Sequence, residues 1–406
     1  MSTQWPGGIL SKTAPTITAP TDGEGGSASG MWTMDEVLVH EKAGNWPKIL
    51  LQGELWTWGY NSQGQLGKGD TTSYSSPIQV GGLATWVKVS AGYESTYSTK
   101  SDGTLWSIGR NNDGQLGHGN TTALSSPVQV GSLTTWGKIS AGGHSIYNVK
   151  TDGALWVCGK NNVGQLGTGN TTDYSSPVQV GSLTNWLSVS GGYRHCLAIK
   201  TDGTLWSWGE GADGRLGDGG TTDRNSPVQI GSLTTWSKVA AGNVFSTAIK
   251  TDGTLWTWGD GNDGCTGHGN TTDLSSPVQV GSLTTWSKST AGTLNMIMLK
   301  TDGTIWGVGK NEDHGQLGQG DANNYSSPVQ VGGLTTWTDV VSGAEMTFAR
   351  KNDGTFWTWG RNWNGGLGVG NTTNYSSPVQ LGSLTTWVKL PVHLCNARSG
   401  AGIKTS

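Results

Sequence analysis

The sequence predicts an all-β fold: a seven-bladed β-propeller of four-stranded antiparallel blades, with an extended N-terminal arm and one short helix. Three observations predict it. A cassette that begins LWTWG at Leu55 restarts every 50 residues, with one extra residue near His314, so the chain holds seven copies. Each copy contains four short runs of β-branched and aromatic residues, bounded by Gly, Asp, Asn, Ser and Pro. A repeat of this length, with four strands per unit, is typical of a propeller.

The four runs of each copy are predicted to lie side by side in one blade. Asp-Gly pairs such as Asp102-Gly103 separate each fourth run from the next first run, and Asp-Gly favours a tight hairpin turn. Proline opens the second run of every copy, which predicts an edge strand because proline cannot donate to a central ladder. The third run ends in small residues that fit where seven inner strands converge. From the axis outward, the predicted strand types are Trp86–Ser90, Ser95–Lys100, Leu55–Gly59 and Pro77–Val80.

The repeated unit, WG-x-N-x-x-GQLG followed by SSPVQV, TTW-x-KVSAG and KTDGTLW, resembles the RCC1 repeat family. The resemblance covers the chain from about Ile49 to the C-terminus and implies a seven-bladed propeller. Three copies depart from GQLG, at residues 214–217, 264–267 and 365–368.

The two ends of the repeat region are predicted to complete a single blade. Residues 55–80 supply two outer strands, and Trp387–Leu390 together with Ala401–Ser406 supply the missing inner strands. Such closure removes open sheet edges, which are an aggregation liability. The last copy departs from the pattern at PVHLC, residues 391–395, and is three residues longer, so this blade is expected to be irregular.

The N-terminal region is predicted to contain two segments before the propeller, which spans residues 48–406. Residues 1–31 are rich in Gly, Ser, Thr and Pro and indicate an extended arm. Thr33 and Glu36 have capping-box spacing, which predicts a helix from Met34 to Ala43 within residues 32–47. This Trp-flanked segment resembles structural proteins of tailed bacteriophages, where it precedes a variable C-terminal domain. The alternative is a helix that covers one end of the propeller.

Composition excludes several classes of protein. The 25 Lys and Arg residues nearly balance the 28 Asp and Glu residues, and no clustered basic patch indicates nucleic-acid binding. No apolar run approaches membrane-spanning length, and no secretory signal is visible. The core is expected to be built from Trp56, Trp86, Trp106, Trp136 and their equivalents between blades, with a partner for each indole N–H. The four cysteines lack CxxC spacing, and Cys158 occupies a core position.

The sequence does not predict catalysis. The seven histidines are scattered, and no HExxH motif or paired metal-ligand spacing occurs. His118 and His268 share one loop position in distant blades, so they cannot share a metal ion. We therefore expect no enzyme activity, no cofactor and no metal.

Variation between copies is concentrated at one end of the predicted blades, in the loops after SAG and after WG. Variable loops on a rigid scaffold are typical of a binding surface, although unselected loop tips also drift. The candidate binding face consists of Tyr60, Tyr93, Glu94, Arg110, His144, Lys160, Tyr193, Arg194, His195, Glu210, Asp260, Lys310, Glu345, Arg361 and Trp363.

The resemblances imply rival functions. RCC1 exchanges guanine nucleotide on a small GTPase and binds chromatin, but the acidic balance and absent basic tail argue against chromatin here. A plant ultraviolet receptor of this fold uses clustered Trp where this chain has none, and a bacterial β-lactamase inhibitor of this fold binds through one propeller face. The leading hypothesis is a non-enzymatic virion component of a tailed phage, bound to other virion proteins through residues 1–47 and presenting the propeller to a protein or host surface. The alternatives are a bacterial cytoplasmic protein-binding scaffold or inhibitor, and a GTPase regulator.

Overall fold

The computed structural model describes residues 17–18, 27–28, 52–395 and 397–405, and the chain divides into two compact units, Met1–Leu51 and Gln52–Ser406. In the first unit, β1 (Ile17–Thr18) pairs antiparallel with β2 (Ser27–Ala28). The predicted helix at residues 34–43 and most of the predicted arm lie outside the described residues.

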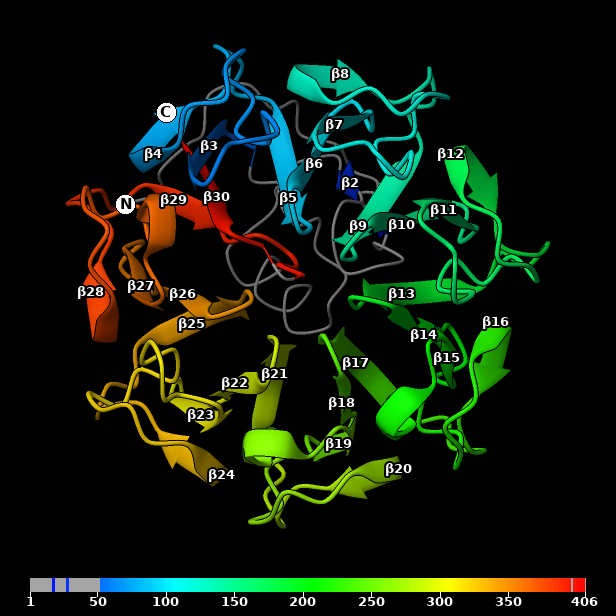
Figure 1. The fold of residues 1–406 in the computed structure, drawn as a ribbon, viewed down its shortest axis with the longest axis vertical. Helices are drawn as coiled ribbons and strands as arrows, with labels where there is room; N and C mark the ends of the chain where they lie inside the picture. Colours follow the sequence, from blue (N-terminus) through cyan, green and yellow to red (C-terminus); the bar gives the residue numbers. More distant parts are fainter. Residues whose placement is uncertain (1–16, 19–26, 29–51, 396, 406) are drawn as a thin grey trace, which may run out of the picture. The chain divides into compact units, whose positions relative to one another are not determined.

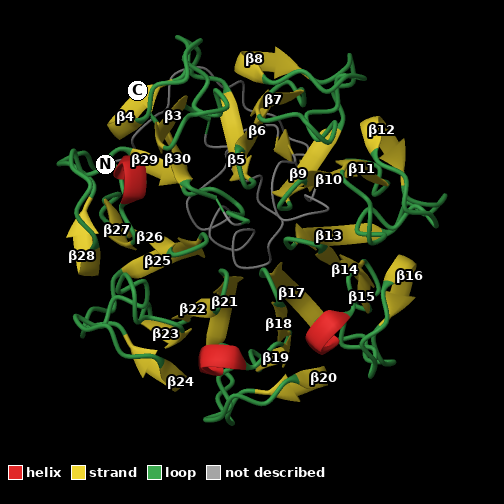
Figure 2. Ribbon diagram, in the orientation of Figure 1, coloured by secondary structure: helices red, strands yellow, loops and turns green. Residues whose placement is uncertain are grey.

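The second unit is a seven-bladed propeller of four-stranded antiparallel sheets, as predicted (Figure 1, Figure 2). Blades 1 to 6 comprise β5–β8, β9–β12, β13–β16, β17–β20, β21–β24 and β25–β28, and the closing blade comprises β29, β30, β3 and β4.

Strands of one type share one position in every blade. The innermost strands are β5 (Trp86–Ala91), β9 (Trp136–Ala141), β13 (Trp186–Gly191), β17 (Trp236–Ala241), β21 (Trp286–Ala291), β25 (Trp337–Ser342) and β29 (Trp387–Lys389). The second strands are β6 (Ser95–Lys100), β10 (Ser145–Lys150), β14 (His195–Lys200), β18 (Phe245–Lys250), β22 (Asn295–Lys300), β26 (Met346–Lys351) and β30 (Ser399–Lys404). The third strands are β7 (Leu105–Gly109), β11 (Leu155–Gly159), β15 (Leu205–Gly209), β19 (Leu255–Gly259), β23 (Ile305–Gly309), β27 (Phe356–Gly360) and β3 (Glu54–Gly59). The outer strands are β8 (Leu124–Gln129), β12 (Tyr174–Gln179), β16 (Arg224–Gln229), β20 (Leu274–Gln279), β24 (Tyr325–Gln330), β28 (Tyr375–Gln380) and β4 (Tyr74–Gln79). Three 3₁₀ turns follow third strands: η1 (Ala212–Gly214), η2 (Asn262–Gly264) and η3 (Trp363–Gly365).

The predicted strand order within each blade is confirmed, but the outer strand begins earlier than predicted. In β4, Pro77 is the fourth residue of the strand rather than the first. As predicted, β4 is the outer edge strand: it pairs with β3 on one side, and no described strand pairs with its other side. Its pairing with β3 is also irregular, since the register shifts between Thr57 and Gly59. Proline is therefore tolerated within this strand.

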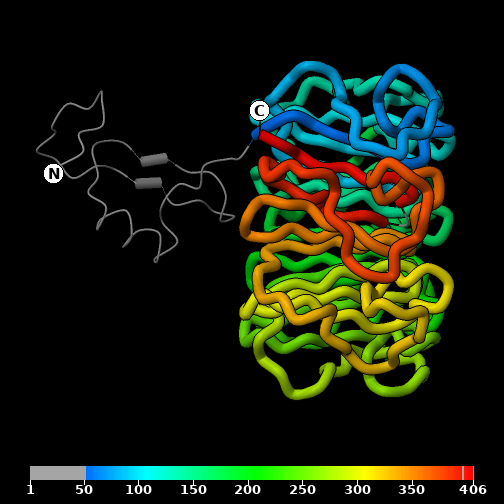
Figure 3. Tube along the Cα trace, turned by 90° about the vertical axis from the view of Figure 1, so that its left-hand side faces the viewer, coloured from blue at the N-terminus to red at the C-terminus, as the bar shows by residue number. Residues whose placement is uncertain are grey.

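The predicted closure of the ring is also confirmed. In the closing blade, β29 and β30 from the C-terminus pair with β3 and β4 from the start of the propeller. The early strands lie against the last strands in both views of the ring (Figure 1, Figure 3). The second strand runs from Ser399 to Lys404 and thus begins two residues before the predicted Ala401.

The predicted irregularity of this blade has a definite form. After β29, the chain leaves its own sheet and runs along β5 of blade 1: Val392 N–H donates to Val89 O at 2.8 Å, and Cys395 N–H donates to Ala91 O at 3.0 Å. The loop between β29 and β30 reaches into the middle of the ring (Figure 1). Leu394 is fully buried there, so the added residues fill space near the axis.

Indole rings join neighbouring blades, as expected for the inner-strand set: Trp136 of blade 2 packs in one buried cluster with Leu105 and Val130 of blade 1. Trp106 and its equivalents are only partly buried.

A further indole position, which was not among those predicted for the core, also joins the blades. Trp208 of β15 is fully buried, and its Nε1 donates to the Gln165 carbonyl oxygen of blade 2 at 2.9 Å. The inner-strand tryptophans differ from the expectation that every indole N–H has a partner. The indole nitrogens of all seven have no hydrogen-bond partner among the described residues. These rings instead meet a second indole edge to face, as Trp86 meets Trp106 at 6.0 Å.

Candidate functional site

The predicted variable loops lie at one end of the blades, here called the loop face. In blade 1, the residue after the third strand returns to the residue before the second strand, because Arg110 N–H donates to Glu94 O at 2.8 Å. The same contact recurs in the closing blade, where Tyr60 N–H donates to Arg398 O at 3.4 Å. The opposite end, with the Asp-Gly turns and GSLTTW segments, is the turn face.

The long loops of the loop face are held by an internal asparagine. In blade 1, Asn111 is fully buried, and its amide nitrogen donates to the Asn120 and Thr122 carbonyl oxygens, both at 3.0 Å. Its side-chain oxygen accepts the Leu116 N–H at 2.9 Å. These hydrogen bonds fix the conformation of the loop that begins at Arg110, so its side chains project from a rigid backbone.

Opposite charges occupy this repeated contact in three blades. Ion pairs join Arg110 to Glu94 at 3.2 Å and Arg194 to Glu210 at 3.1 Å, and the equivalent pair in blade 6 joins Arg361 to Glu345. The predicted residues of these three pairs thus neutralise one another within their own blades.

Aromatic and cationic side chains form a continuous arc across the closing blade and its neighbours. Tyr60 stacks on Trp363 with ring centroids 5.6 Å apart and planes 15° apart. The Arg398 guanidinium carbon lies 5.2 Å from the Trp363 ring centroid and 4.9 Å from that of Tyr93. Beyond Tyr93, the ring of His144 follows at 5.5 Å, and Tyr193 follows His144 at 5.7 Å. This arc draws its residues from five consecutive blades: blade 6, the closing blade and blades 1 to 3.

Other predicted residues take part in local contacts. Lys160 lies 3.7 Å from an Asp113 carboxylate oxygen, and Lys310 lies 3.0 Å from that of Asp313. Asp260 is nearly buried and accepts the Asn262 N–H at 2.7 Å.

His195 does not present itself on the loop face. It is fully buried, and its Nε2 lies 2.9 Å from the Ser246 hydroxyl oxygen of the next blade. Burial lowers its pKa to about 3, so the ring is neutral near neutral pH. The residue belongs to the packing between blades 3 and 4.

Sequence reasoning missed Arg398, the residue at the centre of the arc. It lies in the irregular last copy, where comparison between copies loses its register. The available signal was its position directly before β30, which corresponds to Glu94, Arg194 and Glu345 in other blades.

The described residues contain no group of three or more His, Cys, Asp or Glu residues placed to hold a metal ion. His118 and His268 occupy equivalent positions, and each contacts a hydroxyl of its own blade, in Ser107 and Thr257, at 2.9 Å. The four cysteines are free and buried, with Cys158 in the core as expected. Burial raises the pKa of Cys158 to about 12, which disfavours a reactive thiolate.

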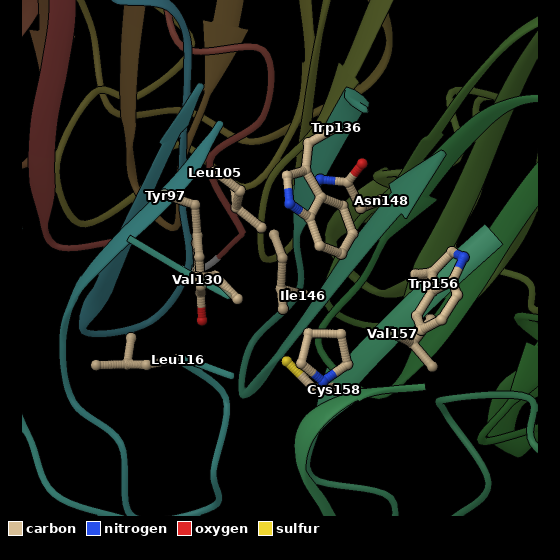
Figure 4. A pocket seen from close by; sticks show the side chains of 11 residues that line it. Tyr97, Leu105, Leu116, Val130, Trp136, Ile146, Asn148, Trp156, Val157 and Cys158 are labelled. Carbon is tan, nitrogen blue, oxygen red and sulfur yellow. The ribbon is translucent and has the colours of Figure 1, made fainter. Parts of the chain in front are cut away.

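Two hollows formed by the described residues are lined mainly by apolar side chains and glycines. A cavity of about 10 Å³ between blades 1 and 2 is lined mainly by apolar side chains, with Asn148 beside Trp136 (Figure 4). This volume holds about one water molecule. A hollow of about 480 Å³ beside Trp56 and Trp387 is lined by Gly, Pro, Val and Leu residues together with a few polar ones. Within the described part of the chain, no helix is long and apolar enough to cross a membrane.

The fold and the loop face define the class of this protein: a seven-bladed repeat propeller whose loops vary at one end of the ring. The family model described as the RCC1-like domain matches residues 26–293, and the model for the regulator of chromosome condensation (RCC1) repeat matches residues 302–350 and 353–390. The chain therefore belongs to the RCC1 family, as the repeat predicted.

Solved structures agree on the fold. Human WBSCR16 is 20% identical, with a TM-score of 0.77 over 87% of this chain and 99% of that chain. Prp20p from Saccharomyces cerevisiae, studied for its binding to Gsp1p and histones, is 18% identical, with a TM-score of 0.78 over 88% of this chain and 93% of that chain. Yeast RCC1 (Prp20) bound to Kap60 is 18% identical, with a TM-score of 0.76 over 87% and 90% of the two chains. No curated protein sequence matches this chain. The resemblance of residues 32–47 to phage proteins stays a prediction.

Proposed function

We propose that this protein is a non-enzymatic binding propeller of a tailed-phage virion, attached through residues 1–47 and displaying its loop face to a protein or host surface. The proposal is supported by a difference between the two ends of the ring in how much their residues vary from blade to blade. The turn face repeats nearly the same residues in each blade, whereas the loop face differs from blade to blade. A constant face suits attachment, and a variable face suits recognition.

The chain enters the propeller at the turn face. Gly53 N–H donates to Trp86 O at 2.9 Å, and Trp86 N–H donates to Gly53 O at 3.1 Å. Trp136 likewise donates to Gly103 O in an Asp-Gly turn of this face. Seven leucines, one in each GSL or GGL segment, are 41 to 52% exposed: Leu83, Leu133, Leu183, Leu233, Leu283, Leu334 and Leu384. In the proposed role, this apolar set faces the particle.

The loop face has the composition of a protein-binding surface. Trp363 is 47% exposed and is surrounded by tyrosine and arginine side chains of the arc. Aromatic residues and arginine are enriched in interface centres. The buried, high-pKa cysteines and the dispersed histidines support a role in binding rather than catalysis.

Mass spectrometry of purified particles tests the proposed location, and the chain should be present in stoichiometric amounts. A variant that lacks residues 1–47 should keep the thermal stability of the propeller yet fail to enter particles. Absence of the full-length chain from particles, or normal incorporation of the shortened chain, would contradict the proposal.

The same shortened variant separates the alternatives. A bacterial cytoplasmic scaffold or inhibitor would keep full partner binding without residues 1–47 and would not copurify with particles. A GTPase regulator, suggested by the binding of Prp20p to Gsp1p, would accelerate nucleotide release from a small GTPase. The proposed virion protein should have no effect on nucleotide release.

A further inference from the structure

We propose that Arg398, with Tyr60, Tyr93 and Trp363, forms a receptor on the loop face for a carboxylate side chain of an acidic protein segment. The inference deepens the proposed function, since it rests on recognition at the loop face and names the chemistry of the partner.

The repeated contact of the loop face shows what is unusual about Arg398. In blade 3, Arg194 occupies the same position before the second strand, and Glu210 after the third strand neutralises it at 3.1 Å. In the closing blade, Arg398 retains the cation, but Tyr60 stands where the acid would be. The blade has the arginine of the ion pair without its partner.

The surroundings of Arg398 do not supply that charge from elsewhere. Among the described residues, no carboxylate lies within 4.0 Å of its guanidinium nitrogens. The nearby cations Arg110 and Arg361 each pair with a glutamate of their own blade. The unneutralised cation of the arc is therefore Arg398.

The rings around Arg398 hold the guanidinium in a defined position. Its carbon lies 4.9 Å from the Tyr93 centroid and 5.2 Å from the Trp363 centroid, and Tyr60 stacks against Trp363. Ring contacts engage the π system of the cation and leave its N–H groups to bind an acceptor. A planar guanidinium held in this way is suited to a carboxylate, which it binds through two parallel hydrogen bonds.

The composition of the site favours a protein as the source of that carboxylate. Trp363 is half exposed, and tryptophan, tyrosine and arginine together are the residues most enriched in the energetic centres of protein interfaces. The ion pairs on either side, Glu94 with Arg110 and Glu345 with Arg361, form a polar rim around this centre.

Binding of poly-L-glutamate to the full-length protein, measured by titration calorimetry at about 150 mM salt, tests the receptor. The unmodified protein should bind, and Arg398→Gln should weaken binding at least about tenfold, because charge-assisted hydrogen bonds are lost. Arg398→Lys should give intermediate affinity, since it keeps the charge without the planar fork. Tyr60→Glu should also weaken binding about tenfold although the arginine remains, because the new carboxylate recreates the Arg194–Glu210 arrangement.

The matched control is Arg224→Gln on the outer strand of blade 3, where the guanidinium nitrogen already pairs with Asp218 at 2.8 Å. It removes the same charge and should change affinity less than about twofold. Thermal melting checks that each variant is folded.

Three results would overturn the receptor. These are unchanged binding by folded Arg398→Gln or Tyr60→Glu, an equal loss in Arg224→Gln, and binding of a polyuronate such as alginate without binding of poly-L-glutamate. Incorporation of the same variants into particles is measured separately. A failed receptor with normal incorporation leaves the virion role intact, whereas absence from particles with intact poly-L-glutamate binding refutes the virion role alone.

Discussion

Substitution of Ala154 by threonine should stabilise the protein, because it would give blade 2 a hydrogen-bonded hydroxyl that five other blades have. In blade 3, the Thr204 hydroxyl donates to an Asp202 carboxylate oxygen at 2.6 Å and accepts the Trp206 Nε1–H at 2.9 Å. Blades 1, 4, 5 and 6 repeat this arrangement. Blade 2 has Ala154 in its place, and the buried Trp156 Nε1 has no hydrogen-bond partner among the described residues.

The last lysine of the second strand also lies differently in blade 2 from its position in the blades with threonine. Its Nζ lies 3.5 to 3.7 Å from the third-strand tryptophan centroid in the five blades with threonine. In blade 2, Lys150 lies 4.6 Å from Trp156 and 6.0 Å from Trp136. The backbone at the turn is unchanged, since Ala154 N–H still donates to Asp152 at 2.9 Å. A threonine can therefore take the position without rebuilding the turn.

The expected gain follows from two new hydrogen bonds and one satisfied donor. A net hydrogen bond contributes about 1 kcal/mol, and an unsatisfied buried donor costs about 1–3 kcal/mol. We expect Ala154→Thr to raise the free energy of unfolding by about 1–2 kcal/mol. The reverse change in blade 3, Thr204→Ala, should lower it by about 1–3 kcal/mol.

Equilibrium urea unfolding of the full chain measures these changes. Ala154→Val is the control, because it adds the same branched shape without the hydroxyl and should stay within about 0.5 kcal/mol of the parent. If valine stabilises as much as threonine, packing rather than hydrogen bonding is responsible. If Ala154→Thr is neutral while its unfolding slope is unchanged, the reasoning from the repeated network is wrong.

Three further predictions concern the protein interior. Burial lowers the pKa of His195 to about 3 and of His393 to about 4, so the unfolded chain binds more protons as the pH falls below about 6.5. The contribution of these two neutral histidines to the free energy of unfolding should be fully present above that pH and should be lost as the pH falls toward 4. The loss from His393 alone should be about 3 kcal/mol. A free energy of unfolding that does not change between pH 7 and pH 4 would contradict this. Trp208→Phe should lower the free energy of unfolding by about 1–3 kcal/mol, because the Gln165 carbonyl loses its indole donor; unchanged urea unfolding would show that this bond does not join the blades. The four buried cysteines should be inert to a thiol reagent in the native protein and react after denaturation, whereas rapid native labelling would show that the core opens.

Local chemistry explains why most of the fold could be predicted. Asp102-Gly103 forms the expected hairpin turn, since Gly103 adopts a φ of 78° and its carbonyl accepts the Trp136 N–H. The predicted start of the outer strand at Pro77 is wrong, because the strand begins at Tyr74 and contains the proline. Within an edge strand, a missing N–H costs little when it faces away from the neighbouring ladder.

The candidate site was predictable in part. The charged pair Arg110 and Glu94 could be assigned to one face, since both follow the repeat. The burial of His195 could not, because it depends on the neighbouring blade, where Ser246 supplies the hydrogen-bond partner.

The sequence by itself determined the number of blades, the strand order and the closing blade, because each depends on short-range signals that recur with one period. The path of residues 391–395 along β5, and the contacts of Arg398 with Tyr93 and Trp363, were decided by the tertiary structure alone. The physical reason is that periodicity places a residue by analogy with its equivalents in other copies. A segment without equivalents is placed by its packing against distant blades, which become neighbours once the ring has closed.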